Sequence, residues 1–206
     1  MKKFLLTAAA AIGTTTMAMP AQAVVIDFEG TGASCCFGAA PLTDLYSGLG
    51  VTFDGVGGDP GTILNQTGNF GVDARSGTDF LAYNDGVGTN DGRLIFSSAV
   101  SDFSIYAGGG RGDGVFSADF FDSANNLLGS QTVNVTLGNY GLLSYAGPVS
   151  FVNISSDQAF WVLDDLSFNA AAVPEPATWA FMIFGFGAIG GAMRRQRKAN
   201  VKVSYA

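Results

Sequence analysis

Histidine is absent from the 206-residue sequence. This absence excludes Ser-His-Asp and Cys-His catalysis, and it excludes every metal site that needs an imidazole ligand. Chemistry that uses two carboxyl groups, as in glycoside hydrolysis, is left open because it needs only Asp or Glu. The sequence contains 17 acidic residues, and no spacing among them singles out a catalytic pair.

Cysteine is scarce, since the only two are the neighbours Cys35 and Cys36. Adjacent cysteines close only a small strained ring or bridge to another chain, so neither arrangement provides the stabilisation of an ordinary long-loop disulfide. Two neighbouring thiols alone are also too few for a structural zinc site. Export to an oxidising compartment favours a disulfide, either as the small ring or as a bridge to another chain.

Basic residues are few between the two ends of the chain. Between Val24 and Ala172 there are 16 acidic residues and three basic ones, Arg75, Arg93 and Arg111, so the net charge is −13. So acidic a surface argues against nucleic acid and anionic lipid as partners. It fits either simple solubility or bound cations.

The first 23 residues have the pattern of a secretory signal peptide. Two lysines precede an apolar stretch over residues 4–12, and Ala21-Gln22-Ala23 is a small-x-small cleavage site. The pattern predicts export across the inner membrane by the secretion machinery, and cleavage by signal peptidase after Ala23. The mature chain then begins at Val24.

Residues 177–193 form an apolar run without charge, followed by Arg194, Arg195 and Arg197. As a helix, these 17 residues rise roughly 26 Å, slightly short of a ~30 Å hydrocarbon core. The run predicts a transmembrane helix whose basic flank leaves residues 199–206 as a cytoplasmic tail. Residues 24–172 then lie on the far side of the membrane, with enough length for one domain.

The sequence before this run is Pro174-Glu175-Pro176, and Trp179-Ala180 opens the run itself. The two prolines predict an extended backbone, which is the conformation that a protease binds, and the tryptophan fits the membrane interface. The whole string over residues 173–198 resembles a PEP-CTERM sorting domain of the PEPxxWA variant. This resemblance implies a membrane-anchored precursor in an exopolysaccharide-producing cell. An exosortase-type membrane protease would remove the tail and leave the protein at the cell surface or outside it.

The region between the two signals alternates apolar and polar residues in short runs. Clusters of Gly, Asn, Asp and Ser separate these runs, and no stretch shows a sustained helical period. The sequence therefore predicts an all-β, two-sheet sandwich, and the resemblance described next implies that it is jelly-roll-like. The expected strands are Val24–Glu29, Gly50–Asp54, Phe80–Tyr83, Leu94–Ser97, Phe103–Tyr106, Val115–Phe121, Leu128–Val135, Val149–Ile154 and Phe160–Phe168.

The segments IDFEG, GVTF, RLIFSSAVSDFSIYAG and FWVLDDLSF follow one another in an order that loosely resembles a jelly-roll carbohydrate-binding-like domain. This resemblance implies first and last strands that lie side by side, with a structural calcium near them. The acidic residues available there are Asp27, Glu29, Asp164 and Asp165. Calcium takes six to eight oxygen ligands, so two or three carboxylates and loop carbonyls would suffice.

The period of a strand complicates this calcium site. Alternation places Asp164 on the core side with Leu166, whereas Asp27 and Glu29 face away from the core. Only a bulge or a strand end would bring the two pairs together. A buried Asp164 needs a partner, which is calcium, an arginine or backbone amides. Alternation also points Asp164 and Asp165 to opposite faces, where they cannot flank one glycosidic bond.

These patterns leave three functions to compare. The leading hypothesis is a non-enzymatic surface or matrix protein that is associated with exopolysaccharide. The alternative is a secreted glycan hydrolase that uses paired carboxylates. A structural or adhesive biofilm protein without a small ligand has the same sequence signature as the first.

Overall fold

The computed structural model describes residues 22–33, 40–55, 60–65, 70–83, 91–170 and 176–198. The chain divides into two compact units. One spans Ala21–Ala171 and contains the strands, and the other includes helix α1, Pro176–Lys198. Most of the predicted signal peptide, the Cys35-Cys36 pair, Pro174, Glu175 and the tail 199–206 lie outside the described residues.

The described part of the β-rich unit contains eleven strands and one short 3-10 helix. They are β1 (Gln22–Ile26), β2 (Ala40–Pro41), η1 (Ser47–Leu49), β3 (Val51–Gly55), β4 (Thr62–Asn65), β5 (Asp79–Tyr83), β6 (Asp91–Gly109), β7 (Gly114–Phe121), β8 (Leu127–Val135), β9 (Tyr140–Tyr145), β10 (Val149–Ser156) and β11 (Trp161–Ala170).

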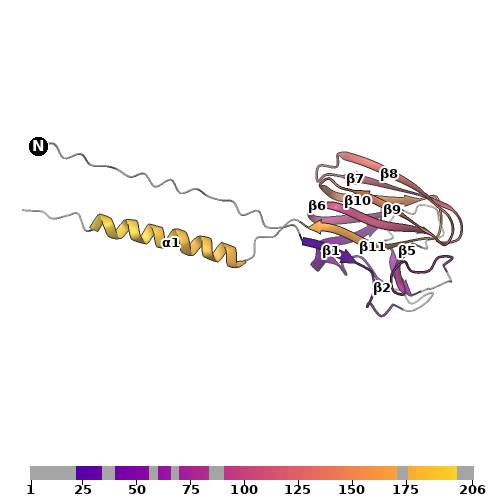
Figure 1. The fold of residues 1–206 in the computed structure, drawn as a ribbon, viewed down its shortest axis with the longest axis horizontal. Helices are drawn as coiled ribbons and strands as arrows, with labels where there is room; N and C mark the ends of the chain where they lie inside the picture. Colours follow the sequence, from indigo (N-terminus) through magenta and orange to yellow (C-terminus); the bar gives the residue numbers. More distant parts are fainter. Residues whose placement is uncertain are drawn as a thin grey trace, which may run out of the picture. The chain divides into compact units, whose positions relative to one another are not determined.

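The strands form two antiparallel sheets that share β6 (Figure 1). Sheet A has the order β2-β4-β5-β11-β6-β9, and β1 pairs with β11 beyond the end of β5. Sheet B has the order β3-β6-β10-β7-β8. Strand β6 pairs in sheet B over its first half and in sheet A over its second half. The prediction of an all-β unit is therefore confirmed.

The main core lies between the inner faces of the two sheets and is rich in aromatic residues. Leu94, Val152 and Phe120 enter it from sheet B, and Phe103 and Phe168 enter it from sheet A. Burying each such side chain contributes roughly 1.5–3 kcal/mol, which makes this cluster the chief source of stability.

A second, smaller cluster lies on the outer face of sheet A. It consists of Leu64, Phe70, Val72, Phe80, Ala82 and Val162. Strand β5 contributes Phe80 and Ala82 to this cluster and Leu81 and Tyr83 to the main core. Its remaining residue, Asp79, is also buried. The segment after β4 therefore covers part of the outer face of sheet A.

The predicted strands correspond to real ones, with differences that have physical causes. The separate strands predicted at Leu94–Ser97 and Phe103–Tyr106 are one strand, β6, because the residues between them include no glycine or proline and the strand continues through Asp102, whose φ is 51°. Strands β2, β4 and β9 were not predicted. Strands β2 and β4 have only two and four residues, which is too short for a clear alternation. In β9, the run Gly141-Leu142-Leu143 breaks the alternation.

Helix α1 includes the whole predicted run 177–193. Its apolar side chains at Ile183, Phe184 and Phe186 are exposed. Within the described residues, however, no helix is sufficiently long and apolar to pass through a membrane. The helix itself is thus as predicted.

Candidate functional site

The segment from Gly71 to Asp79 lies over the outer face of sheet A and forms one wall of a pocket. Two sets of carboxylates, one on β11 and one in the turn after β1, hold it in place. This segment, called the 71–79 segment below, was not singled out in the sequence. In the sequence, the segment is marked only by the polar run Arg75-Ser76-Gly77-Thr78, which has no strand or helix pattern.

Asp164 and Asp165 of β11 hold the first half of the segment. Asp164 Oδ2 accepts hydrogen bonds from the backbone N–H of Arg75 at 2.7 Å and of Ser76 at 3.2 Å, and its Oδ1 accepts from the N–H of Asp165 at 2.8 Å. Asp165 accepts from the Ser76 hydroxyl at 2.6 Å and forms an ion pair with Arg75. The partners of buried Asp164 are therefore backbone amides, one of the three alternatives that the sequence left open.

The predicted orientation of this acidic pair is wrong. Asp165 has a left-handed φ of 48°, and the pairing of β11 with β6 shifts register between Asp164 and Ser167. Such a bulge changes which face a residue occupies. Asp164 contacts the 71–79 segment outside sheet A, while Leu166 packs in the main core. Both carboxylates therefore converge on Ser76 instead of diverging.

Burial changes the acidity of two groups beside the segment. The pKa of the Asp164 carboxyl is raised to about 6, because loss of solvent outweighs the three N–H donors that favour its charged form. The pKa of the Tyr140 hydroxyl is raised by burial and then by the nearby charges of Asp164 and Asp165. Tyr140 therefore acts here as a neutral hydrogen-bond donor.

Glu29 holds the second half of the segment. Its Oε1 accepts hydrogen bonds from the backbone N–H of Thr78 and of Asp79, both at 2.6 Å. Gly77 has a φ of +57°, and a Cβ there would collide with the Glu29 carboxylate. A glycine is thus required at position 77 by both backbone and space.

Asp27 and its surroundings complete the acidic site. Asp27 accepts a hydrogen bond from the N–H of Glu29 at 3.2 Å, in a turn where Phe28 has a φ of 62°. This turn ends β1 at Ile26, three residues before the predicted end. Burial, followed by the charges of Asp27, Asp79 and Glu29, raises the pKa of the Tyr46 hydroxyl to about 12.

The four residues predicted to bind calcium therefore hold the same 71–79 segment, or the turn beside it, through protein hydrogen bonds. The bulge at Asp165 directs Asp164 and Asp165 to this segment, and the turn after β1 directs Glu29 to it. Within the ranges that the structure describes, no group of three or more acidic or cysteine side chains is placed to hold a metal ion. A calcium ion at this site stays a prediction.

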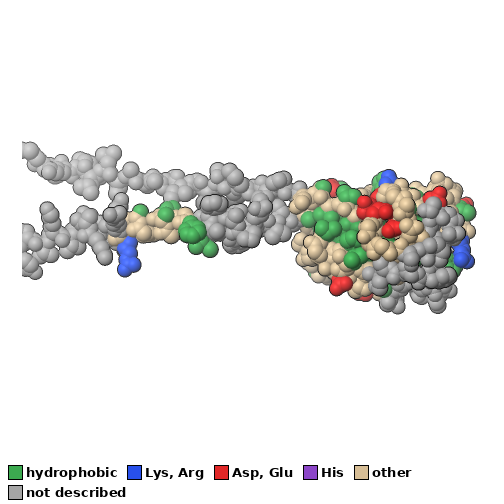
Figure 2. All heavy atoms as spheres, turned by 90° about the horizontal axis from the view of Figure 1, so that it is seen from below, with side chains coloured by type: hydrophobic (Ala, Val, Ile, Leu, Met, Phe, Trp, Pro, Cys, Tyr) green, Lys and Arg blue, Asp and Glu red, His purple; other side chains and the backbone are tan. Residues whose placement is uncertain are grey.

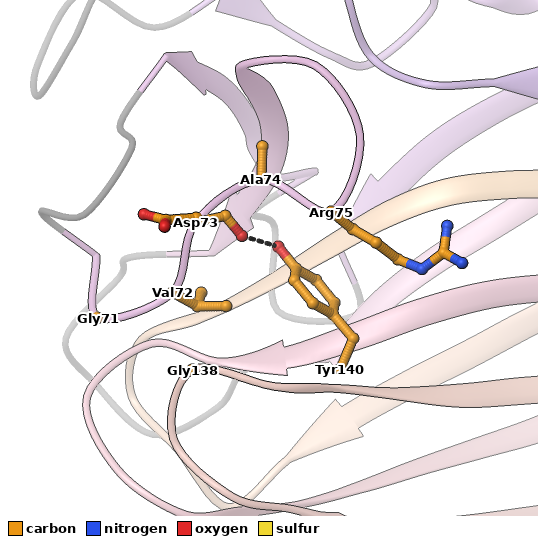
Figure 3. Close-up of a pocket in the computed structure, with 7 residues that line it drawn as sticks. All are labelled: Gly71, Val72, Asp73, Ala74, Arg75, Gly138 and Tyr140. Carbon is orange, nitrogen blue, oxygen red and sulfur yellow. Dashed lines mark hydrogen bonds between the residues drawn. The ribbon is translucent and has the colours of Figure 1, made fainter.

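A pocket of about 330 Å³ opens beside the segment (Figure 3). Its lining consists of Gly71, Val72, Asp73, Ala74, Arg75, Gly138 and Tyr140. The Tyr140 hydroxyl donates to the carbonyl oxygen of Asp73 at 2.9 Å. In Figure 3 the Asp73 carboxylate and the Arg75 guanidinium point in opposite directions from the segment. The volume is at the lower end of the range for small-ligand sites.

Aromatic side chains of the kind that stack on sugar rings mostly contact other protein groups here. Trp161 and Tyr83 are buried and stack on each other at 4.2 Å. Tyr145 stacks on Phe120, and the ring of Tyr106 carries the Arg75 guanidinium at 3.5 Å. Tyr140 is thus the aromatic residue that reaches the pocket.

All three arginines of the β-rich unit lie over aromatic rings. Besides Arg75, Arg93 lies 5.3 Å from the centroid of Phe151, and Arg111 lies 4.0 Å from that of Phe160. The three arginines are the only basic residues of this strongly acidic unit, so each of its positive charges lies over an aromatic ring. On the face shown in Figure 2, hydrophobic and acidic side chains adjoin each other.

The predicted sorting residues belong to the second unit. Pro176 is the first residue of α1, and Trp179, Ala180, Arg194, Arg195 and Arg197 follow along it. The side chain of Arg194 is exposed. At the other end of the chain, Ala23 of the predicted cleavage site lies in β1 opposite Asn169.

Comparison with known proteins identifies the C-terminal motif. Residues 172–198 match the family model described as the PEP-CTERM protein-sorting motif. This motif implies export, a membrane-anchored precursor and processing by an exosortase-type membrane protease. Comparison with curated proteins gives no significant match.

Several solved structures are similar to the chain at low identity. The CBM22-1–GH10 modules of xylanase 10B from Clostridium thermocellum, complexed with xylohexaose, match 60% of this chain and 26% of theirs, at 14% identity and a TM-score of 0.37. A DUF4465 family protein from Bacteroides caccae matches 75% of this chain and 95% of its own, at 11% identity and a TM-score of 0.42. TmCBM61 in complex with β-1,4-galactotriose matches 59% and 83%, at 14% identity and a TM-score of 0.31. With TM-scores below 0.5, these likenesses assign neither a ligand nor an activity.

Proposed function

We propose that this chain is an exported, non-enzymatic surface protein that an exosortase-type protease releases from a membrane-anchored precursor and that then associates with exopolysaccharide. The observation that carries the proposal is the PEP-CTERM motif at residues 172–198. Its β-rich unit, a jelly-roll-like sandwich in this proposal, is the cargo. The signal peptide over residues 1–23 provides the export step.

The hydrogen bonding of the acidic site supports a non-enzymatic role. General acid catalysis needs a carboxyl group that reaches the substrate. Asp164 is fully buried and its oxygens accept three backbone N–H groups, while Asp165 is paired with Arg75 and Ser76. Both carboxylates serve to hold the 71–79 segment.

The pocket beside that segment supports contact with glycan. Tyr140 offers a ring edge, Asp73 and Arg75 offer an acceptor and donors, and Gly71 and Gly138 leave backbone groups accessible. An aromatic ring with a few polar groups nearby is typical of small-ligand sites. In this proposal the pocket takes a sugar unit of the exopolysaccharide.

Sorting is tested by replacing Pro174, Glu175 and Pro176 with alanine in the full chain. The variant should keep its tail and accumulate in the membrane fraction, whereas wild type and a Thr178→Ala control should be processed. Mass spectrometry of the C-terminus reports the outcome. Identical processing of the triple variant and the wild type would refute the sorting step.

Glycan contact at the pocket is tested by pull-down of the exported protein with exopolysaccharide from the producing cells. Tyr140→Ala should reduce the bound fraction severalfold, and Leu142→Ala on the same exposed strand should not. Release of reducing sugar is measured in the same samples. Reproducible release that is lost on mutation of two acidic residues would favour the hydrolase alternative.

A further inference from the structure

The outer face of sheet B is formed by five adjacent strands, β3, β6, β10, β7 and β8. In each strand, alternate residues enter the main core, as Leu94, Val152 and Phe120 do. The residues between them face outward because side chains alternate along a strand. The pairing registers align these outward residues into rows that cross the sheet.

One row is apolar. It places Ile95, Phe151, Phe121 and Leu127 side by side on β6, β10, β7 and β8. Ile95 is 36% exposed and Leu127 is 58% exposed, and the rings of Phe121 and Phe151 stack at 4.7 Å. An exposed, contiguous apolar surface of this kind marks an interaction site on a soluble protein.

The next row is polar and crosses all five strands through Asp54, Arg93, Asn153, Asp119 and Ser130. Its side chains are oriented by their neighbours. Arg93 Nε donates to Asn153 Oδ1 at 2.8 Å, and the Ser130 hydroxyl donates to Asp119. Arg93 also lies over the ring of Phe151, which links the polar row to the apolar one.

A third row carries hydroxyl groups. It contains Ser155, Ser117 and Thr132, and the hydroxyl oxygens of Ser117 and Thr132 lie 3.0 Å apart. The three rows together offer an apolar strip beside two strips of donors and acceptors. At the usual spacing of strands, this face is roughly 19 Å wide across four intervals.

We propose that the outer face of sheet B binds an uncharged polysaccharide chain that lies across the strands along these rows. A sugar ring has an apolar C–H face and a rim of hydroxyl groups, so its face meets the apolar row and its hydroxyls meet the other two. The face extends over five paired strands, which suits an internal stretch of a polymer. The inference rests on the proposed association with exopolysaccharide and adds the class of polymer and the place where it binds.

Charge selects an uncharged polymer. The unit carries 16 acidic residues against three arginines, which repels a polyanion, and Arg93 lies beside Asp54 in the polar row, with Asn153 between it and Asp119. A flat apolar partner surface would remove water from this charged row without replacing its hydrogen bonds. Sugar hydroxyls replace them directly, as both donors and acceptors.

The test is affinity electrophoresis of the exported protein in gels that contain hydroxyethylcellulose, dextran or alginate. At least one of the two uncharged polymers should retard the wild type, and alginate should not. Phe151→Ala and Asn153→Ala should each weaken the retardation about tenfold. Asn134→Ala, the same residue type on the same face but outside the three rows, should behave as wild type.

Melting temperatures establish that each variant is folded, and if Phe151→Ala fails to fold, Asn153→Ala decides. The inference is wrong if neither uncharged polymer retards the wild type. It is also wrong if both row variants bind normally while Tyr140→Ala does not, which would keep glycan binding but place it in the pocket. A dimer of the wild type that Phe151→Ala converts to a monomer, seen by light scattering, would assign the face to a second copy. Tail processing is measured separately, so its failure is distinguishable from these outcomes.

Discussion

The buried carboxylate of Asp164 accepts a hydrogen bond from the backbone N–H of Ser76, which lies 88 positions earlier in the chain. This contact and its neighbours fix a segment without regular structure onto the outer face of a sheet. The pocket beside the segment depends on this attachment, because Arg75 and Asp73 line it. The acidic residues at the two ends of the β-rich unit are therefore structural supports of the candidate site.

Stability should depend on pH through Asp164. Its folded-state pKa of about 6 lies above its ordinary value of 3.8, so the folded protein binds the proton more tightly than the unfolded chain does. The free energy of unfolding should therefore be higher at pH 4 and decrease as the pH rises through 6, by up to roughly 3 kcal/mol. The charged and titratable groups that face the same carboxyl are Arg75, Asp165 and Tyr140, and the variants compared leave all three unchanged.

Denaturant unfolding of the wild type and Asp164→Asn at several pH values measures this dependence. The variant should lose the decrease between pH 4 and 6, and an Asp54→Asn control on an exposed strand position should keep it. Parallel profiles for the wild type and Asp164→Asn would contradict the assignment.

Replacing Gly77 should destabilise the protein more than replacing another glycine of similar conformation. Gly77→Ala forces a side chain into a left-handed backbone and against the Glu29 carboxylate. Gly138→Ala has the same kind of backbone, with φ of 79°, and no atom within 4 Å of the new Cβ. We expect about 1 kcal/mol for Gly138→Ala and a further 1–3 kcal/mol for Gly77→Ala, from the two N–H groups that lose Glu29. Equal losses in chemical unfolding would show that Glu29 does not anchor the segment.

Gln131 should protect the free edge of sheet A. Its side chain donates to the carbonyl oxygen of Leu142 at 3.2 Å and accepts from the N–H of Ser144 at 2.6 Å, so an amide of β8 takes the place of a further strand beside β9. Unpaired strand edges promote association between chains. Gln131→Ala should speed hydrogen exchange at Ser144 at least tenfold and increase aggregation, whereas Thr132→Ala should leave both unchanged. Unaltered exchange at Ser144 would remove this role.

Calcium binding at Asp27, Glu29, Asp164 and Asp165 predicts a higher melting temperature in millimolar calcium than in chelator. Binding to the folded state alone stabilises by about 2.7 kcal/mol at a hundredfold excess over Kd. A rise of several degrees that Asp164→Asn abolishes would establish the ion beside the 71–79 segment. Superimposed melting curves would leave backbone amides as the partners of Asp164.

The sequence by itself determined the parts of this protein that depend on local pattern. The PEP-CTERM motif is a short string with a fixed order of elements, so residues 172–198 were recognisable without a fold. The all-β class followed from alternation within single strands, since Leu94, Phe120 and Val152 reveal a buried face in a few residues each. The burial of Asp164 was also predicted, from an alternation that placed it in the core with Leu166, whereas the structure buries it under the 71–79 segment.

Only the tertiary structure decided what holds the candidate site together. The bulge at Asp165 reverses the face that alternation assigns to Asp164, and a single left-handed residue leaves no periodic signal in a sequence. Glu29 and Thr78 are 49 positions apart, and their contact exists only because β1 and β5 meet the same edge of β11. The rows on sheet B likewise require the registers of five strands at once. Register is set by pairing between distant segments, which local periodicity does not specify.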